Sequence, residues 1–166
     1  LGHTNLGAAE VAEANEVAAA NGLSRFISGQ NDYSLLNRAA EAEILPALEG
    51  AGMGFLPYYP LANGLLTGKI GPDRQFGEGD LRRGNRRFSK TNLERVAAML
   101  DQIRPIAEKH RATLGQLAVA WTVAQPGVTA ALCGARNPQQ AVENAAAGSL
   151  TLSPEELDTI GNAVHS

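Results

Sequence analysis

The sequence predicts an α/β fold in which about four parallel strands are covered by outer helices, which amounts to half of a (β/α)8 barrel. Short apolar segments alternate with helical ones, and no turn signal joins two strands into a hairpin. The 166 residues make one partial domain, residues 1–166, because a complete barrel needs about 250 residues. A small doubly wound sheet is the alternative, but no Gly-x-Gly-x-x-Gly turn follows any strand.

The first third of the chain holds three of the expected strands and two helices. The strands lie around Leu1, at residues 26–28 and at residues 54–58. Residues 8–21 place small apolar side chains on one helical face and end at an Asn-Gly pair, and residues 40–51 form a second helix that glycines end.

A long irregular stretch at residues 68–90 follows, rich in glycine and arginine. Loops of this length in a compact domain are uncommon and tend to cover binding sites. We expect this one to be a mobile loop over a cofactor or substrate, because few apolar anchors offset its ordering entropy. The alternative is a solvated surface loop whose acidic residues partly neutralise the arginines.

The remaining elements show clear helix start signals. Thr91 opens a capping box, and Pro105 is expected to kink or break the helix that follows. Residues 113–125 form a capped helix, and residues 128–132 form a buried strand. Two further helices begin with a cap residue followed by proline, at Asn137-Pro138 and Ser153-Pro154.

Composition excludes several function classes. A net charge of −3 and a pI near 5.6 argue against a general nucleic-acid binder. No apolar run reaches the roughly 18–20 residues that a membrane span needs, so no membrane partner is expected. The single Cys133 has no internal disulfide partner, and no Cys/His spacing resembles a metal site. A reducing cytoplasmic location is expected.

The strongest physical signal lies after the last strand, where Gly134 and Arg136 precede a helix that begins near Asn137. A helix N-terminus exposes unpaired N–H groups and attracts phosphate, and the last loops of a barrel commonly form a phosphate site. The alternative is a plain capped helix with Arg136 in solvent.

Other polar residues gather where strands give way to loops: Thr4-Asn5, Gln30-Asn31 and Tyr58-Tyr59. That end of a barrel is its active face. Amide side chains there suit an amide-bearing ligand, and an aromatic ring suits stacking on a flat one. The alternative is that these side chains only cap loops and fill the rim.

Taken together, these motifs resemble the aldo-keto reductases, and especially the branch that includes potassium-channel beta subunits and bacterial reductases. The resemblance covers essentially the whole chain, in family order. It implies the second half of a TIM (β/α)8 barrel, with the N-terminal half missing. The segments that carry it are residues 1–5, 30–38, 55–62, 64–69 and 134–144.

The resemblance also implies a role for each site residue. Thr4, Asn5 and Gln30 would hold the nicotinamide carboxamide, and Tyr58 would stack on the nicotinamide ring. Lys69 would reach toward the pyrophosphate, and Arg136 would pair with a 2′-phosphate, which favours NADP as the cofactor. The remaining implied contacts are Tyr59, Pro60, Leu61 and Ala62 along the pyrophosphate, and Gly134, Gln140, Glu143 and Asn144 at the adenosine end.

The sequence departs from the family pattern at several of these segments. Tyr59 stands where serine is frequent, and Asn63 stands where glycine is common. Asparagine tolerates the left-handed turn that glycine would make there. Gly29 precedes Gln30 in place of a β-branched residue, which should loosen that strand.

No residue here matches the family's catalytic Asp, Tyr, Lys and His, which come from the first four strands. The resemblance therefore implies the cofactor-binding part of a reductase that converts aldehydes and ketones to alcohols, inactive by itself. The alternative is a non-catalytic NADP-binding regulatory subunit. The expected partners are a small carbonyl substrate in the complete enzyme and, through exposed strand edges, a second copy of the chain.

Overall fold

The computed structural model describes residues 1–165 and the side chains of residues 1–164. Its sheet has three parallel strands in the order β1-β2-β3: β1 is Gly2–Thr4, β2 is Ser28–Gln30 and β3 is Gly54–Phe55. Each strand is followed by helical structure, so the expectation of parallel βα units is confirmed for these three strands. Their bounds differ from the prediction: β2 lies at residues 28–30 and not at 26–28, and β3 ends at Phe55 and not at Tyr58.

The fourth expected strand, residues 128–132, is present only as two single parallel bridges beside β3. Val128 pairs with Phe55, and Leu132 pairs with Tyr58. The prediction that this segment is buried was wrong: the side chain of Leu132 is 40% exposed. The segment bonds to residues 55–58 on one side, and no other strand of the described residues pairs with its second side.

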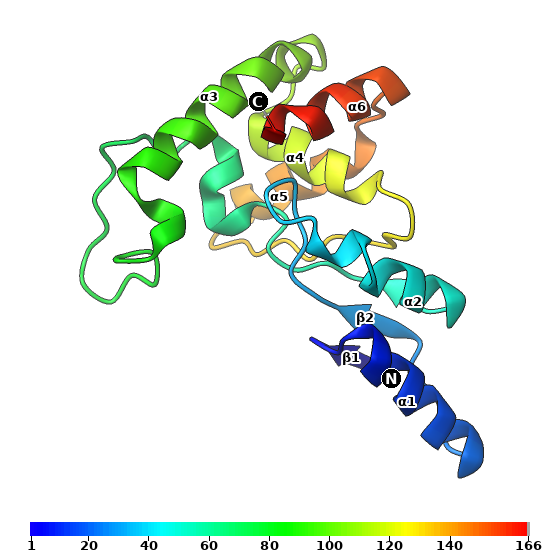
Figure 1. The fold of residues 1–166 in the computed structure, drawn as a ribbon. Helices are drawn as coiled ribbons and strands as arrows, with labels where there is room; N and C mark the ends of the chain where they lie inside the picture. The colour runs from blue at the N-terminus through cyan, green and yellow to red at the C-terminus, as the bar shows by residue number, and fades with distance from the viewer. Residues whose placement is uncertain (166) are drawn as a thin grey trace.

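The described residues also form six α-helices and five short 3-10 turns (Figure 1). Helices α1 and α2 lie beside the strands, whereas α3, α4, α5 and α6 lie at the other end of the molecule. The α-helices are α1 Ala8–Ala20, α2 Ile44–Gly50, α3 Lys90–Lys109, α4 Leu114–Val123, α5 Pro138–Ala146 and α6 Pro154–Asn162. The 3-10 turns are η1 Ala39–Glu41, η2 Ala62–Thr67, η3 Arg86–Phe88, η4 Ala147–Ser149 and η5 Ala163–His165.

Three of the predicted helix starts are confirmed by side-chain caps. Thr113 and Gln116 form a capping box at α4, and Ser153 and Glu156 form one at α6. At α5 the side chain of Asn137 accepts a hydrogen bond from the backbone N–H of Gln140. These caps satisfy N–H groups that the first turn of a helix leaves unpaired.

Helix α3 differs from the prediction at two points. Its cap is Ser89, whose hydroxyl accepts from the backbone N–H of Asn92, and not Thr91. It also continues through Pro105 without a break. Proline removes one backbone hydrogen bond, but Ile103 and Ala107 on either side of it are buried in the core, and this packing holds the helix together.

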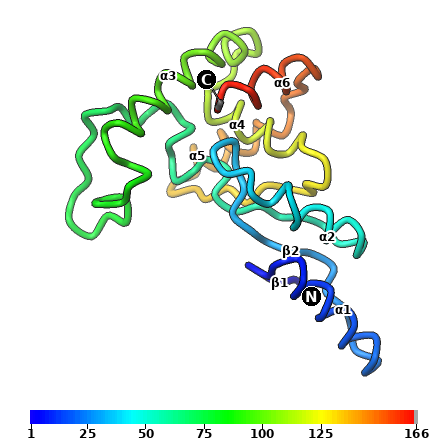
Figure 2. The backbone as a smooth tube through the Cα atoms, viewed as in Figure 1, coloured from blue at the N-terminus to red at the C-terminus, as the bar shows by residue number. Residues whose placement is uncertain are grey.

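The loop at residues 68–90 extends to one side of the molecule and returns at the start of α3 (Figure 2). Apart from η3 it is irregular. Phe76 and Phe88 meet edge to face at 5.3 Å, and the guanidinium of Arg82 lies 4.6 Å from the centre of the Phe76 ring. The loop therefore carries an apolar cluster of its own, which the sequence analysis did not foresee.

Gly29, the departure within β2, faces the buried ring of His3. A Cβ at position 29 would lie 2.7 Å from Cε1 of His3 and 3.0 Å from Cδ2 of Leu48. Neither ring nitrogen of His3 has a hydrogen-bond partner among the described residues, and burial lowers the pKa of this imidazole. The glycine therefore makes room for a histidine ring on the neighbouring strand, where a β-branched residue would collide with it.

We expect Gly29→Ala to lower the free energy of unfolding by about 1–3 kcal/mol, because overpacking forces neighbouring side chains out of position. The loss should shrink when His3→Ala removes the obstructing ring. Urea denaturation of the two single variants and the double variant measures this coupling. An equal loss from Gly29→Ala in both backgrounds would show that His3 is not the obstacle.

Candidate functional site

Four of the predicted site residues meet at the carboxyl ends of the strands. The backbone N–H of Asn5 donates to the carbonyl of Gln30 at 2.8 Å, and the hydroxyl of Thr4 donates to the same carbonyl at 3.3 Å. The Tyr58 hydroxyl donates to Oδ1 of Asn5 at 2.7 Å. Residues 4, 5, 30 and 58 therefore form one connected group on three neighbouring segments.

The amide groups in this cluster keep hydrogen-bonding capacity. Within the described residues the side-chain amide of Gln30 has no hydrogen-bond partner, and Nδ2 of Asn5 donates no hydrogen bond. The ring of Tyr58 is half-buried, and it meets Tyr59 edge to face at 5.0 Å. The cluster thus presents amide donors and acceptors beside an aromatic ring.

The chain after Tyr58 adopts a strained backbone. Tyr59, Ala62 and Asn63 all have positive φ, of 59°, 47° and 57°. Such angles are uncommon for residues other than glycine and cluster at functional sites. Asn63 adopts the left-handed conformation that its position was expected to require, inside η2, where Leu65 and Leu66 are buried.

Lys69 and Glu143 are joined although they lie 74 positions apart. Nζ of Lys69 lies 3.4 Å from Oε1 of Glu143, linking the start of the loop to α5. The side-chain amide of Gln116, on α4, donates to the backbone carbonyl of Glu143 at 3.0 Å. Sequence reasoning missed Gln116 as a positioning residue, because its only signal there is its part in the capping box of α4.

The segment from Gly134 to α5 is held by its own polar side chains. The backbone N–H of Arg136 donates to Oε1 of Gln140 at 2.9 Å, and Nδ2 of Asn144 donates to the carbonyl of Gly134 at 3.2 Å. Among the described side chains, no carboxylate lies within 4.0 Å of the Arg136 guanidinium. Arg136 is exposed beside the N-terminus of a nine-residue helix.

This segment adjoins the strand-end cluster. The backbone N–H of Leu132 donates to the carbonyl of Pro57 at 2.9 Å, which places Gly134 two residues beyond the pairing with Tyr58. Helix α4 contacts both η2 and α5 and so supports the two parts of the site together.

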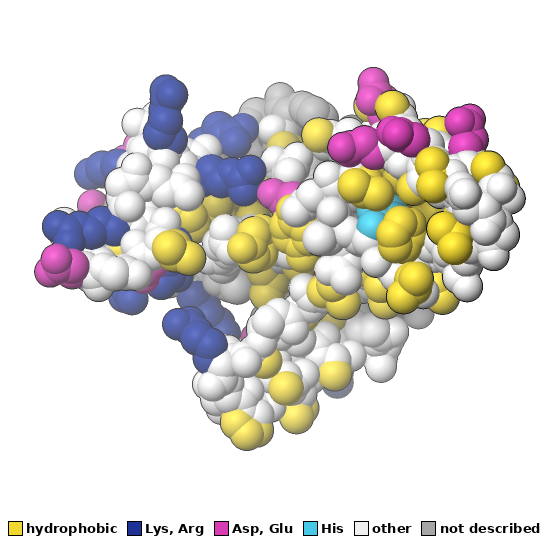
Figure 3. Space-filling view, turned by 90° about the horizontal axis from the view of Figure 1, so that it is seen from below, with side chains coloured by type: hydrophobic (Ala, Val, Ile, Leu, Met, Phe, Trp, Pro, Cys, Tyr) yellow, Lys and Arg dark blue, Asp and Glu magenta, His cyan; other side chains and the backbone are white. Residues whose placement is uncertain are grey.

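The loop at residues 68–90 reaches the same end of the molecule. Hydrogen bonds from the side chain and backbone of Arg82 lower the pKa of the Asp80 carboxyl, and the positive charge of Arg136 lowers it further. Lys and Arg side chains gather over the loop side of the molecule in the view from below (Figure 3).

A polar network fixes the segment that follows β2. The hydroxyl of Tyr33 donates to Oε1 of Glu41 at 2.7 Å, and the guanidinium of Arg38 donates to both carboxylate oxygens. Burial acts to raise the pKa of Glu41, but the hydrogen bonds from Arg38 and Tyr33 outweigh it and lower that pKa. Burial and the Glu41 hydrogen bond raise the pKa of Tyr33, which stays neutral. The network ties the segment that follows Gln30 and Asn31 to η1.

Three parallel strands with helices and with polar side chains at their carboxyl ends are consistent with part of an α/β barrel. The chain belongs to the aldo/keto reductase family, whose sequence pattern matches residues 1–164. No helix in the described part of the chain is both long and apolar enough to cross a membrane.

Several known proteins are similar to this chain. It is 38% identical over 124 residues to the NADH-specific methylglyoxal reductase of Escherichia coli, covering 75% of this chain and 37% of that protein. It is 34% identical over 174 residues to a probable voltage-gated potassium channel subunit beta of Oryza sativa, covering 99% of this chain and 52% of that protein.

Among solved structures, the glycerol dehydrogenase of Gluconobacter oxydans superimposes with a TM-score of 0.84 at 30% sequence identity. The match covers 99% of this chain and 48% of that one. The chain therefore spans about half, or less, of the length of these relatives.

Proposed function

We propose that this chain is the second half of a TIM (β/α)8 barrel and forms the NADP-binding part of a reductase that converts aldehydes and ketones to alcohols. The observation that carries the proposal is the strand-end cluster, in which Tyr58 is bonded to Asn5 and Asn5 to Gln30. Family membership supports an oxidoreductase. The cluster supplies what a nicotinamide ring and its carboxamide require, namely a flat aromatic face and amide groups with capacity to spare.

Phosphate binding is assigned to the two other parts of the site. Lys69 and the segment from Tyr59 to Ala62 would line the pyrophosphate, and Arg136 would pair with a 2′-phosphate at the N-terminus of α5. The fit rests on the guanidinium of Arg136, which is exposed and has no carboxylate partner among the described residues. Glu143 and Asn144 would contact the adenine, with Gln140 and Gly134 shaping the turn.

In such a reductase the nicotinamide supplies the hydride and the protein supplies orientation and a proton. Here Tyr58, Asn5 and Gln30 would orient the ring toward the carbonyl carbon. No residue of this chain is proposed to hold the transferred proton. Residues 1–166 are therefore proposed to be inactive alone.

The cofactor assignment predicts that NADP(H) outcompetes NAD(H) in the whole protein that carries this chain. Arg136→Ala should weaken NADP(H) binding by about 10- to 150-fold, because a charge-assisted hydrogen bond contributes about 1.5–3 kcal/mol. NAD(H) binding should change little, since it lacks the 2′-phosphate. Fluorescence titration with both cofactors measures the ratio.

The matched control is Arg104→Ala, which removes an exposed arginine on α3 that pairs with Asp101 at 2.7 Å. This control should leave both affinities unchanged. Equal affinity of the unaltered protein for both cofactors would count against the assignment. The relative from Escherichia coli is an NADH-specific reductase, so the titration with both cofactors tests the assignment directly.

A second candidate function is a non-catalytic NADP-binding regulatory subunit. It is favoured by the match to the rice channel beta protein, which covers 99% of this chain. The two functions share the cofactor site and differ in chemistry. Steady-state assay of the whole protein with an activated aldehyde distinguishes them, because a regulatory subunit would bind NADPH without turning it over.

The loop at residues 68–90 is proposed to move when cofactor binds. Its ion pairs to the rest of the protein, Lys69 with Glu143 and Arg87 with Asp32, are partly exposed and stabilise little by themselves. The Phe76–Phe88 contact ties two points of the loop to each other.

A further inference from the structure

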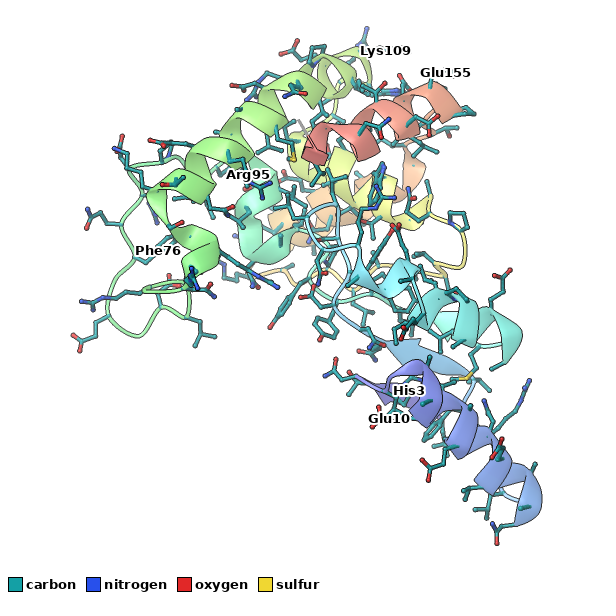
Figure 4. The ribbon with its side chains drawn as sticks, viewed as in Figure 1. His3, Glu10, Phe76, Arg95, Lys109 and Glu155 are labelled. Atoms are coloured by element: carbon teal, nitrogen blue, oxygen red, sulfur yellow. The ribbon has the colours of Figure 1, made fainter. Side chains whose placement is uncertain are left out.

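A small cavity of about 280 Å³ lies where η2 approaches the segment after β2 and the start of α3. Three arginines line it: Arg86, Arg87 and Arg95. Arg95 projects from the first half of α3, above the part of the loop that holds Phe76 (Figure 4). Ala62 lines the cavity as well, so it adjoins the segment proposed to hold the pyrophosphate.

The positive charge in this cavity is poorly compensated. No carboxylate is among the residues that line it. Arg87 has one distant partner, Oδ2 of Asp32 at 3.5 Å, and Arg95 donates only to the neutral Oδ1 of Asn92 at 3.4 Å. Arg86 forms no ion pair among the described side chains. Like charges held close together repel one another, and an anion bound between them would relieve that repulsion.

The backbone adds to this imbalance. The N-terminus of a helix carries a partial positive charge, which acidic side chains usually complement. The first turn of α3 has no acidic residue, and Arg86, Arg87 and Lys90 stand at that end instead. The N-terminus of α3 and the basic side chains beside it therefore both contribute positive charge to this part of the molecule.

The arginines are also held in position. Nδ2 of Asn92 donates to the backbone carbonyl of Arg87 at 2.6 Å, and its Oδ1 accepts from Arg95. Asn92 therefore holds the backbone of Arg87 and the guanidinium of Arg95. A site whose groups are positioned before binding loses less conformational entropy when the ligand arrives.

We propose that this cavity binds the carboxylate or phosphate group of a small organic anion. Guanidinium groups present forked N–H donors that match the oxygens of both groups. Ala62, which lines the cavity, follows Tyr58 of the strand-end cluster by only four residues. If the proposed function holds, the anion is therefore the charged end of the carbonyl substrate. The substrate class is then an aldehyde or ketone that carries a carboxylate or phosphate.

The test is calorimetric titration of the whole protein with malonate and with inorganic phosphate, at low ionic strength. Saturable binding of at least one probe is expected. The double variant Arg86→Gln/Arg95→Gln should weaken it at least tenfold, and Arg104→Gln, on the same helix, should not. No saturable binding, or equal affinity in the double variant and the unaltered protein, overturns the proposal. Thermal denaturation checks that the double variant folds, and Arg86→Gln alone, at an exposed side chain, provides a second comparison.

A second arm distinguishes the cavity from a part of the cofactor site. Binding of the probe that persists when NADPH is saturating supports a separate anion site. Loss of that binding when NADPH is present means that the cofactor's own phosphates occupy the cavity, which overturns the proposal. If malonate or phosphate binds while NADPH does not, the proposed function fails and the anion site stands.

Discussion

Replacing Trp121 with alanine is expected to lower the free energy of unfolding of the whole protein by about 3–5 kcal/mol. The indole is 1% exposed on α4. The ring of Tyr33 stacks on it at 6.2 Å, and the guanidinium of Arg38 lies 5.2 Å from its centre. Its Nε1 donates to the backbone carbonyl of Leu157 at 3.1 Å. The substitution removes a large buried ring and leaves that carbonyl without its donor.

Urea denaturation measures this loss, which is a large part of the roughly 5–15 kcal/mol that stabilises a typical domain. Trp121→Phe is the matched control, because it keeps an aromatic ring and gives up the hydrogen bond and part of the volume. It should cost less than the alanine substitution. A loss below about 1 kcal/mol for Trp121→Ala would mean that Trp121 does not anchor α4 to the rest of the core.

Trp121 also connects the core to the site. Arg38 contacts the indole and donates to Glu41, which accepts from Tyr33. These contacts fix the chain that follows Gln30 and Asn31. The destabilised Trp121→Ala protein should therefore bind cofactor more weakly, although Trp121 itself lies outside the strand-end cluster.

Local signals in the sequence were sufficient for the starts of three helices, but the helix expected at residues 40–51 is divided into η1 at Ala39–Glu41 and α2 at Ile44–Gly50. A cap at Thr113, Asn137 or Ser153 is a short-range hydrogen bond between neighbours in the chain, so residue type and spacing predict it. The predicted start of α3 was wrong because Ser89 and Thr91 are both suitable cap residues. Which of them caps the helix depends on the direction in which the chain leaves η3.

Features that depend on distant neighbours were harder to predict. Gly29 on β2 makes room for the ring of His3 on β1, whereas the sequence alone indicated only that this glycine would loosen its strand. The exposure of residues 128–132 depends on whether another element packs against the side that does not pair with residues 55–58. The hydrophobic pattern of the segment carries no information on that neighbour. Physical reasoning placed Asn5, Gln30 and Tyr58 at strand ends, but their mutual contacts and the link from Lys69 to Glu143 follow from the folded chain.

The other large expected effect concerns residues 1–166 expressed alone, which we predict to show no carbonyl reductase activity. General acid catalysis typically contributes roughly 10²–10⁴-fold in rate, and no residue of this chain is proposed to provide it. The measurement is NADPH-dependent reduction of an activated aldehyde by the purified chain. Adding the complementary half of a related reductase is the control, since a completed barrel should recover turnover.

The strand edges point to the same result. Within the described residues β1 pairs only with β2, and the segment at 128–132 bonds only to residues 55–58, so two edges lack partners. Exposed apolar residues lie at both edges: Leu1 is 78% exposed and Leu132 is 40% exposed. Unpaired edges recruit other chains, so we expect the isolated chain to form dimers, pack loosely or aggregate. Light scattering and gel filtration test this. A stable monomer that turns over at ordinary enzyme rates, about 1–10³ per second, would place the proton-transferring group within these residues and refute the assignment of the chemistry to another part of the barrel.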